Sequence, residues 1–575
     1  MGSNAGLRAA FFAAFLAVAG CGDASKDGAD APGARATASG ETVAANRSAA
    51  GATIDAIVDA EALRKRIETL SSDAFAGRAP VTQGGRKTRD YLIAQMKAIG
   101  LQPGVGDSYE QAVPLVEVAL RPEQSFFAID GERLAPRTEA VYWTKRVVDE
   151  IAFDDSDVVF VGYGVVAPEY GWNDYDGLDV KDKTVVMLIN DPGFATGDDD
   201  LFNGRAMTYY GRWTYKYEEA ARQGAAAAIV IHQTDPASYP WGVVEGGWSG
   251  PQLDLERPDG GAGRAALEAW IQEDVARRLF DNAGLDFDAV QKAARTRGFK
   301  AIPMGDLKAS GKVVNSIRRN ASANVVGVLP GDERPDEYVL YMAHWDHLGR
   351  MFGQKGDDVA NGAVDNATGT AGVLSVAEAF AKADDAPDRS ILVVAVTAEE
   401  SGLLGSAYFG ERPTVPLENI VGGVNIDAFL PTPPSKDVIV VGYGASELED
   451  LLKTAATARG RYLRPDAKPE AGYFYRSDHI SLAKKGVPML YAKSGVDLVA
   501  GGEAAGQAFA ADYTANRYHK PSDEYDPSWD LTGVAGTHDL LYEVGAGMAY
   551  SDDWPNWYDG NEFRALRDAM RAESQ

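Results

Sequence analysis

Six segments of the chain that are almost continuously apolar follow one another between residues 324 and 495. Strands of this kind are buried on both faces, as in a parallel sheet covered by helices. Segments 366–381 and 446–459 have the spacing of helices and alternate with some of these strands. The pattern predicts an α/β fold with a mostly parallel central sheet flanked by helices. The predicted strands are residues 324–331, 338–344, 391–400, 420–427, 438–444 and 488–495.

Side chains able to bind metal ions stand where several of these strands end. His344 closes one strand, Glu399 and Glu400 close the next, and Asp427 closes the one after. Ligands gather at the carboxyl ends of the strands in open α/β sheets, so we expect these side chains to meet in one crevice. Imidazole and carboxylate groups together suit zinc-like divalent ions. A pair of such ions, with a water between them, needs about five protein ligands, one of them shared.

The composition excludes some classes of function. At 575 residues the chain is too long for one ordinary core, and its apolar fraction of 45% is typical of globular proteins. The net charge of −28 argues against a nucleic-acid partner, because a polyanion would be repelled. The single cysteine excludes an intramolecular disulfide.

That cysteine lies at the end of a predicted leader. Residues 1–21 contain Arg8, an apolar run over 9–19 and then Cys21, with small residues directly before it. The run is too short to cross a bilayer but suits a signal peptide. The segment resembles a bacterial lipobox, which implies a lipid anchor at Cys21 and a cell-envelope protein, in the outer membrane facing the periplasm. An ordinary cleaved signal is the alternative. Residues 22–50 read as a flexible tether.

The rest of the chain divides into two predicted units. Helical patterns over 54–70 and 84–99 belong with the later α/β part, so residues 51–119 and 306–575 form one domain. Between them, the β-rich segments 158–165, 183–190 and 226–232 indicate an inserted domain of mixed α and β structure over residues 120–305.

The motifs in combination resemble those of the co-catalytic zinc aminopeptidases, a family that includes bacterial leucyl aminopeptidases and glutamate carboxypeptidase II. They are AHWDHLG (343–349), NGAVDNATGTAG (361–372), TAEE (397–400), NID (425–427) and YHKPSD (518–523). The resemblance implies two divalent ions, most simply zinc, and an insert similar to a protease-associated domain. It implies the metal ligands His344, Asp365, Glu400, Asp427 and His519.

The same resemblance assigns roles within the site. Asp365 would bridge both ions, although an aspartate ahead of a helix is also commonly an N-cap. We expect Asp427 to complete the second ion's ligands together with Glu400 or its partner, and His347 to be a structural or pocket residue.

Three residues receive catalytic roles. Glu399 would be the general base, since two adjacent buried carboxylates avoid repulsion by taking different tasks. Asp346 would hold the other imidazole nitrogen of His344. Tyr518 would donate to the oxyanion, with Tyr473 and Tyr475 as rival candidates.

These residues together predict a two-metal exopeptidase that releases N-terminal amino acids from short peptides. A carboxypeptidase or dipeptidase on the same metal core is the first alternative, and Arg476 would then either pair with a substrate carboxylate or hold neighbouring loops together. A glutaminyl cyclase, which typically uses one zinc, is another enzyme alternative. A catalytically inactive surface binding protein is the non-enzyme alternative. The oligomeric state is left open.

Overall fold

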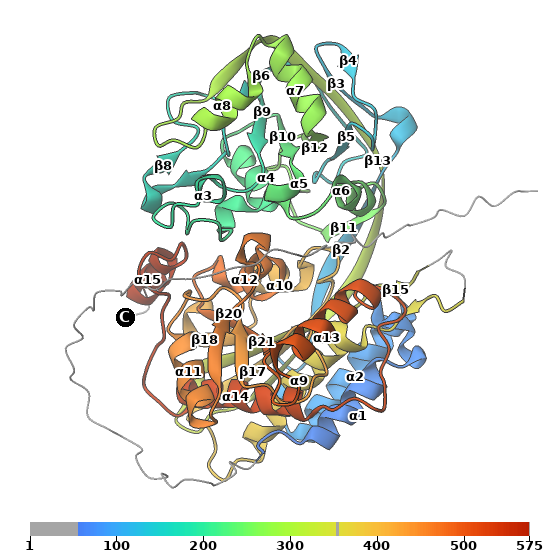
Figure 1. Cartoon of the computed structure of the whole chain (residues 1–575). Helices are drawn as coiled ribbons and strands as arrows, with labels where there is room; N and C mark the ends of the chain where they lie inside the picture. Colours follow the sequence, from blue (N-terminus) through green and yellow to red (C-terminus); the bar gives the residue numbers. More distant parts are fainter. Residues whose placement is uncertain (1–55, 352–355, 574–575) are drawn as a thin grey trace, which may run out of the picture.

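The computed structural model describes residues 56–351 and 356–573. The chain forms two lobes joined by the long strands β2 (Glu110–Leu120) and β13 (Ile302–Leu329). In Figure 1 the insert is the upper lobe, and the lobe that carries the predicted metal ligands is the lower lobe. None of the helices in residues 56–351 and 356–573 is long and apolar enough to cross a membrane. The predicted signal peptide, the lipid-anchor residue Cys21 and the tether lie outside the described residues.

The lower lobe contains the predicted mixed sheet with a parallel centre. Its strands lie in the order β11 (Gln252–Leu255), β2, β13, β17, β14, β18, β21, β19, β20, and the pairs within β17, β14, β18 and β21 are parallel. All eight residues of β17 and all six of β18 are buried, as expected of strands covered on both faces. These strands are β14 (Arg334–His344), β17 (Arg389–Val396), β18 (Ile420–Asn425), β19 (Asp437–Val440), β20 (Tyr462–Pro465) and β21 (Met489–Ser494).

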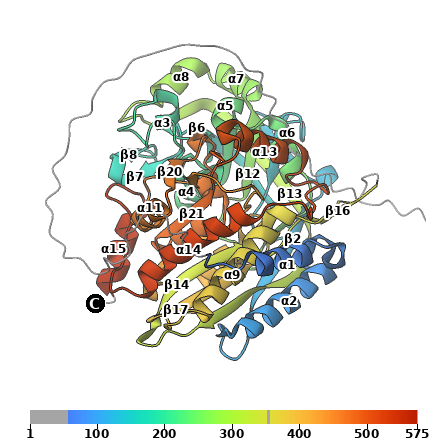
Figure 2. The same cartoon turned by 60° about the horizontal axis from the view of Figure 1, so that its bottom comes forward.

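Two helical layers cover this sheet. One face packs against α1, α2, α9, α11 and α14, which lie in front of the strands in Figure 2. The other face packs against α10, α12 and α15, which lie on the side of the insert in Figure 1. The helices are α1 (Ala60–Leu70), α2 (Gln83–Ile99), α9 (Gly369–Ala381), α10 (Leu404–Glu411), α11 (Leu448–Ala458), α12 (His479–Ala483), α13 (Gly502–Asn516), α14 (Thr532–Ala549) and α15 (Arg564–Glu573).

The helix ends follow from local chemistry. The Asp59 carboxylate accepts hydrogen bonds from Glu61 N and Ala62 N and begins α1. The Thr82 hydroxyl accepts from Gly85 N and begins α2, which ends at Gly100 in a left-handed conformation with φ of 100°. The predicted helix over 84–99 corresponds to α2, and the predicted helix over 446–459 corresponds to α11.

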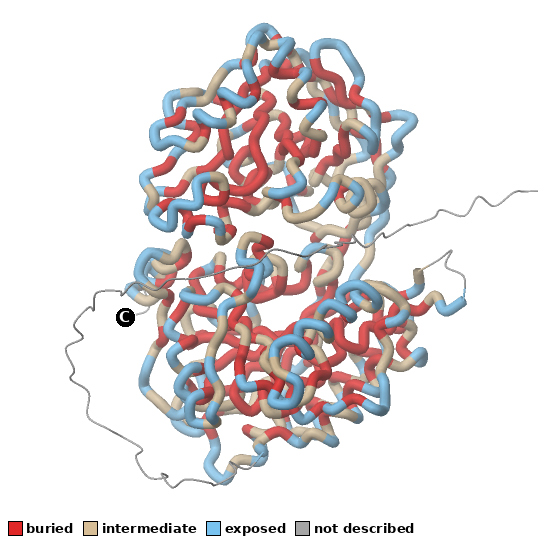
Figure 3. The backbone as a smooth tube through the Cα atoms, viewed as in Figure 1, coloured by how far each residue is buried: buried red, intermediate tan, exposed pale blue. Residues whose placement is uncertain are grey.

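The insert has its own sheet and its own core, visible as a second buried region in Figure 3. Its strand order is β5, β12, β10, β9, β6, β13, β3, β4, with β12, β10, β9 and β6 parallel. The elements are β3 (Phe126–Ile129), β4 (Glu132–Arg133), β5 (Ala140–Trp143), β6 (Glu150–Phe160), β9 (Thr184–Leu188), β10 (Ala227–His232), β12 (Leu267–Gln272), α4 (Trp213–Arg222), α6 (Trp241–Trp248), α7 (Glu273–Asn282) and α8 (Phe287–Ala293).

The boundary between the lobes lies further along the chain than residue 305. Strand β13 pairs with β6 of the insert up to Val314 and with β2 of the lower lobe from Asn315 onward. The change of sheet therefore falls inside one unbroken strand. Because the chain stays extended there, the sequence carries no turn or linker signal at this point. In addition, β11 (Gln252–Leu255), from the insert range, pairs with β2 and extends the lower sheet.

Candidate metal centre

The predicted ligands come from five separate places in the fold. His344 is the last residue of β14, Glu400 follows β17 and Asp427 follows β18. Because these three strands are parallel neighbours, their carboxyl ends meet at one edge of the sheet. Asp365 lies in the turn ahead of α9, and His519 follows α13.

Asp365 does not cap α9. Its backbone angles are non-helical, with φ of −109° and ψ of 95°, and the peptide bond from Asp365 to Asn366 is cis. Its main-chain N–H donates to Oδ2 of Asp523, at 3.1 Å. Its side-chain oxygens lie 3.3 Å from His344 Nε2 and 3.2 Å from His519 Nε2, and no side chain caps α9.

The side chains form two clusters that share Asp365. In the first cluster, His344 Nε2 lies 3.3 Å from Asp365 Oδ1 and 3.3 Å from Asp427 Oδ1. In the second, His519 Nε2 lies 3.2 Å from Asp365 Oδ2 and 3.2 Å from Glu400 Oε2. Each oxygen of Asp365 faces a different cluster, which is the arrangement of a bridging carboxylate.

These distances fit metal binding. Ligand atoms held at 2.0–2.2 Å from a tetrahedral ion are about 3.3 Å from one another. The separations of 3.2 and 3.3 Å in the two clusters agree with that value. Nitrogen and carboxylate oxygen are also the donors that zinc prefers.

The grouping of Asp427 differs from the expectation. Asp427 joins His344 and Asp365, whereas Glu400 belongs with His519 on the other side of Asp365. The difference follows from strand order, because β14 lies between β17 and β18 and separates the strand that carries Glu400 from the strand that carries Asp427.

His347 takes part in the second cluster. Its Nδ1 lies 2.6 Å from Glu400 Oε1, and Nε2 is buried without a hydrogen-bond partner among the described residues. His347, Asp365 and Glu400 together form a further group able to hold an ion. We expected His347 to be a structural or pocket residue and did not predict its contact with Glu400. That contact depends on how the loop after β14 turns.

Asp346 acts on Glu399 rather than on His344. The His344 Nδ1 lies 3.1 Å from the main-chain oxygen of Asp346 but 4.0 Å from its carboxylate, which is beyond hydrogen-bonding distance. The Asp346 Oδ1 instead accepts the main-chain N–H of Glu399 at 3.1 Å. Asp346 is fully buried, and burial raises the pKa of its carboxyl group to about 7.

The two adjacent glutamates have different surroundings, as expected. Glu400 contacts His347 and His519. For Glu399, burial and then the neighbouring charges of Glu400 and Asp478 raise the pKa of the carboxyl group well above its usual range, although His344 opposes them. A carboxylate whose pKa is raised in this way is a stronger proton acceptor than an ordinary glutamate.

The three tyrosine candidates are now distinguishable. The Tyr475 hydroxyl donates to Glu562 Oε1 at 2.7 Å, so it is committed to a structural contact. Tyr518 is 40% exposed, and its ring stacks on His519 with centroids 3.9 Å apart. Tyr473 is 44% exposed and lies beside Arg476. Of these three, Tyr518 is the tyrosine that contacts a predicted metal ligand, His519.

Several residues that hold the ligands in place were not identified from the sequence. Ser477 Oγ lies 2.6 Å from Asp427 Oδ2 and accepts a hydrogen bond from Asn425. Asp523 accepts from the main chain of Val364 and Asp365. Asp523 could have been identified from the sequence, because it is the last residue of the YHKPSD motif. The role of Ser477 becomes apparent only from the fold.

Arg78 joins two of the ligand-bearing loops. It is 1% exposed, and its guanidinium donates to the carbonyl oxygens of Trp345, Asn361 and Gly362. A fourth bond reaches the carbonyl oxygen of Leu70. Arg78 therefore fixes the loop after His344 against the turn that leads to Asp365.

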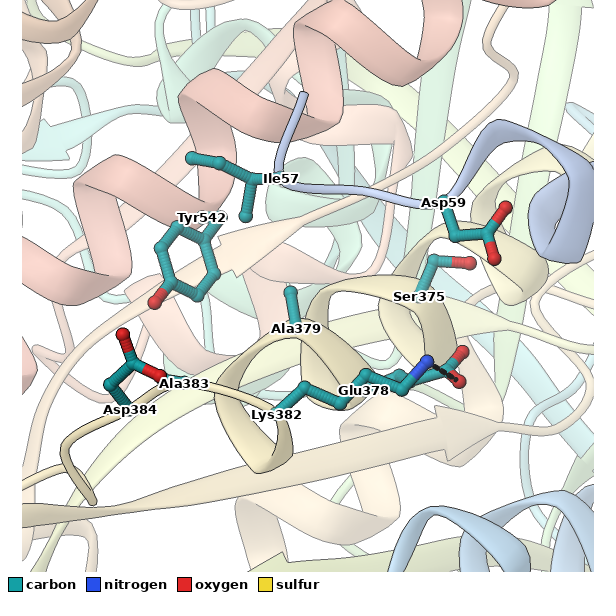
Figure 4. Close-up of a pocket in the computed structure, with 9 residues that line it drawn as sticks. All are labelled: Ile57, Asp59, Ser375, Glu378, Ala379, Lys382, Ala383, Asp384 and Tyr542. Carbon is teal, nitrogen blue, oxygen red and sulfur yellow. Dashed lines mark ion pairs between the residues drawn. The ribbon is translucent and has the colours of Figure 1, made fainter. Parts of the chain in front are cut away.

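A pocket of about 280 Å³ lies elsewhere in the lower lobe (Figure 4). It lies among the start of α1, the end of α9 and α14, and contains the ion pair between Lys382 Nζ and Glu378 Oε1, 2.7 Å apart. None of the metal-ligand candidates lines it. Its lining residues are Ile57, Asp59, Ser375, Glu378, Ala379, Lys382, Ala383, Asp384 and Tyr542.

Comparisons with known proteins point to one family. Residues 324–542 match the family model of peptidase family M28. A segment of 120 residues is 34% identical to the aminopeptidase NAALADL1 of Mus musculus, and 140 residues are 32% identical to a probable glutamate carboxypeptidase LAMP1 of Arabidopsis thaliana. These matches cover 20% and 23% of this chain, and 15% and 18% of those relatives.

The chain thus spans less than a fifth of the length of these curated relatives. Among solved structures, an aminopeptidase from Aneurinibacillus sp. strain AM-1 is 19% identical, with a TM-score of 0.47, and the similarity covers 86% of this chain and 95% of that one. The family match begins at residue 324 and leaves out the insert, so the similarity of the insert to a protease-associated domain stays a prediction.

Proposed function

We propose that the chain is a zinc-dependent exopeptidase of peptidase family M28, the family whose model matches residues 324–542. It binds two ions and releases N-terminal amino acids from short peptides. The observation that supports the two-ion arrangement is the position of Asp365, whose two oxygens face His344 and His519 separately.

The ligands divide between two ions. His344, Asp365 and Asp427 would hold one, and His519, Asp365 and Glu400 the other. Bound there, the ions would polarise the substrate carbonyl and bring the pKa of a water toward neutrality. Burial of Asp365, Glu400 and Asp427 excludes bulk water and strengthens their attraction for cations.

Glu399 moves the proton. Its ionised carboxylate accepts a proton from the attacking water and passes the same proton to the leaving amine, so no net proton is consumed. The raised pKa of Glu399 matches this alternation. Asp346 accepts a hydrogen bond from the main-chain N–H of Glu399 and thereby fixes the backbone position from which the Glu399 side chain extends.

Tyr518 would stabilise the developing oxyanion. A phenol hydroxyl donates to a tetrahedral alkoxide, and stacking on His519 keeps the ring beside the second cluster. Replacement by phenylalanine would keep the stacked ring and remove only the donor. We expect kcat to fall more than KM rises, because this donation strengthens only in the transition state.

The insert would restrict the enzyme to short peptides. Its Met207 N–H donates to the Pro469 carbonyl at 3.2 Å, and its Glu218 accepts from Lys484 at 3.0 Å. These contacts hold the insert against the segments on both sides of Ser477, the loop before it and the end of α12 after it. A series of peptides of increasing length tests this, since cleavage should decline with length, and equal cleavage at all lengths would refute it.

A lipid anchor at Cys21 in the envelope of a bacterial cell is proposed from the sequence alone. Incorporation of labelled fatty acid into the full chain, and its loss in Cys21→Ser, would support the anchor. Equal labelling of both forms would contradict it.

The proposed activity is tested on one peptide prepared with a free and with an acetylated amino terminus, each with and without chelator. The proposal predicts chelator-sensitive cleavage of the free form only. Equal cleavage of both forms would support a carboxypeptidase instead. Absence of cleavage in both, with two ions bound, would favour a binding protein or an unusual substrate.

A further inference from the structure

A tyrosine of the insert packs into the lower lobe. Tyr209 belongs to the short helix Tyr209–Gly211 ahead of α4, and it packs against a core cluster of each lobe. Its ring centroid lies 6.3 Å from the ring of Tyr475 and 6.1 Å from the ring of Phe563, and Lys484 Nζ lies 4.9 Å from it. Aromatic rings attract one another and nearby cations at such separations. Tyr475, Lys484 and Phe563 thus form a socket for Tyr209.

One carboxylate oxygen of the lower lobe contacts both tyrosines. Glu562 Oε1 accepts the hydroxyl of Tyr475 at 2.7 Å and the main-chain N–H of Tyr209 at 3.4 Å. On the insert side, the hydroxyl of Tyr209 donates to Glu218, which also accepts from Lys484 at 3.0 Å. Hydrogen bonds therefore hold Tyr209 in the socket in addition to the ring contacts.

The socket continues directly to a predicted metal ligand. Tyr475 lies in the short helix Tyr473–Arg476, and Ser477 follows this helix. The Ser477 Oγ lies 2.6 Å from Asp427 Oδ2, and Asp427 Oδ1 lies 3.3 Å from His344 Nε2. Ser477 is 2% exposed. Because close-packed interiors transmit displacements, a shift of this helix would move the hydroxyl that holds Asp427.

The second cluster is supported from elsewhere. Glu400 lies 2.6 Å from His347, which belongs to the loop after β14. The ring of His519 stacks on Tyr518, after α13. Both supports belong to the lower lobe and lie outside the socket. A displacement at Tyr209 should therefore reach the first cluster and spare the second.

We propose that Tyr209 is a positioning residue for the metal centre. By filling the socket it fixes the helix Tyr473–Arg476, and through Ser477 it fixes Asp427, so the insert helps to hold the ion of the first cluster. The inference rests on the proposed two-ion centre and adds to it a dependence on the insert. The ion of the second cluster should not depend on Tyr209.

The test is zinc binding by the metal-free full chain, measured by competition with a chromophoric chelator. His519→Ala and His344→Ala each leave one cluster intact. In His519→Ala, adding Tyr209→Ala should weaken zinc binding by roughly three- to tenfold, less than the loss of a direct outer partner. The effect is partial because Asn425 also holds Ser477, at 2.7 Å. In His344→Ala it should change nothing, and equal effects in both backgrounds would overturn the proposal.

A double-mutant cycle tests the route through Ser477. Tyr209→Ala, Ser477→Ala and the double variant are compared in the otherwise unchanged chain. If Tyr209 acts through Ser477, the double variant should bind zinc about as Ser477→Ala does, because contacts in one network are not additive. Additive losses of zinc affinity would refute this route.

Further variants separate positioning from loss of the fold. Tyr209→Phe keeps the ring in the socket and loses only the bond to Glu218, so zinc affinity should stay near that of the wild type. Glu562→Leu removes the acceptor that Tyr209 and Tyr475 share, and it should repeat the loss even if Tyr209→Ala does not fold. The matched control is Tyr443→Ala, a lower-lobe tyrosine that is 54% exposed, which should affect neither ion. Unchanged zinc affinity in Glu562→Leu would contradict the proposal.

Zinc binding also separates this inference from the proposed activity. Two bound ions that are both unaffected by Tyr209→Ala would keep the metal centre and reject the positioning role. The expected loss in a chain that cleaves no peptide would support the positioning role and reject the peptidase function. A wild type without zinc in the first cluster would reject both.

Discussion

Replacement of Arg78 by methionine tests how the ligand-bearing loops are held together. Methionine keeps most of the buried stem and removes the guanidinium. Four main-chain carbonyl oxygens, of Leu70, Trp345, Asn361 and Gly362, would lose their donor. Each buried acceptor left unpaired costs at least about 1 kcal/mol, partly offset because a buried charge also disappears. We expect the free energy of unfolding to fall by about 3–5 kcal/mol.

The assay is urea unfolding of the metal-free protein, wild type and variant side by side, followed by zinc titration of the folded forms. The control is Arg86→Met on the exposed face of α2, expected to change stability by less than about 0.5 kcal/mol. Zinc affinity should also fall, since Arg78 joins the loops that carry His344 and Asp365. A loss below about 1 kcal/mol with unchanged zinc affinity would refute this reasoning.

Three further predictions concern single residues. Glu399→Gln should keep both ions and lower turnover by roughly 10²- to 10⁴-fold, and retained turnover in metal-loaded protein would contradict the proton role. His347→Ala should still bind two ions at saturating metal, but the affinity for one of them should fall by about ten- to a hundredfold, because His347 orients Glu400. His344→Ala should lose an ion. Metal analysis by mass spectrometry would show the difference. Burial lowers the pKa of His538 from 6.5 to about 4, so the unfolded chain gains this proton first as the pH falls. In the metal-free protein the free energy of unfolding should therefore decline by up to about 3 kcal/mol between pH 6.5 and 4, and urea unfolding of His538→Gln should show a shallower decline, whereas equal slopes would reject this cause.

The central sheet was predictable because buried parallel strands leave a clear pattern. Segments 391–400 and 420–427 are almost continuously apolar up to the polar residues that end them, and β17 and β18 correspond to their apolar parts. The insert boundary was misplaced for the opposite reason. Strand β13 continues through residue 305 and changes partners at Asn315 without forming a turn.

The sequence predicted that the candidate ligands lie close together, but not how they are grouped. Because His344, Glu400 and Asp427 each stand at the end of a predicted parallel strand, the sequence predicts that they share one edge of the sheet. Which of them share an ion depends on strand order, and strand order is a non-local property that no spacing records. Strand β14 lies between β17 and β18 and so separates Glu400 from Asp427, and Asp427 Oδ1 lies 3.3 Å from His344 Nε2.

Side chains that act through their hydrogen bonds were the least predictable. The pattern His-x-Asp suggested that the Asp346 carboxylate holds His344, yet it holds the main chain of Glu399. Such contacts depend on tertiary structure that local sequence does not encode.

The most direct test of the account is a zinc titration of the metal-free chain, with bound zinc and peptide hydrolysis measured at each step. The account predicts two ions per chain and hydrolysis that reaches its maximum only when the second ion is bound. Asp365→Asn should weaken both ions, because one oxygen of Asp365 faces each cluster. Maximal hydrolysis at one ion per chain, or binding of both ions unaffected by Asp365→Asn, would contradict the shared two-metal centre.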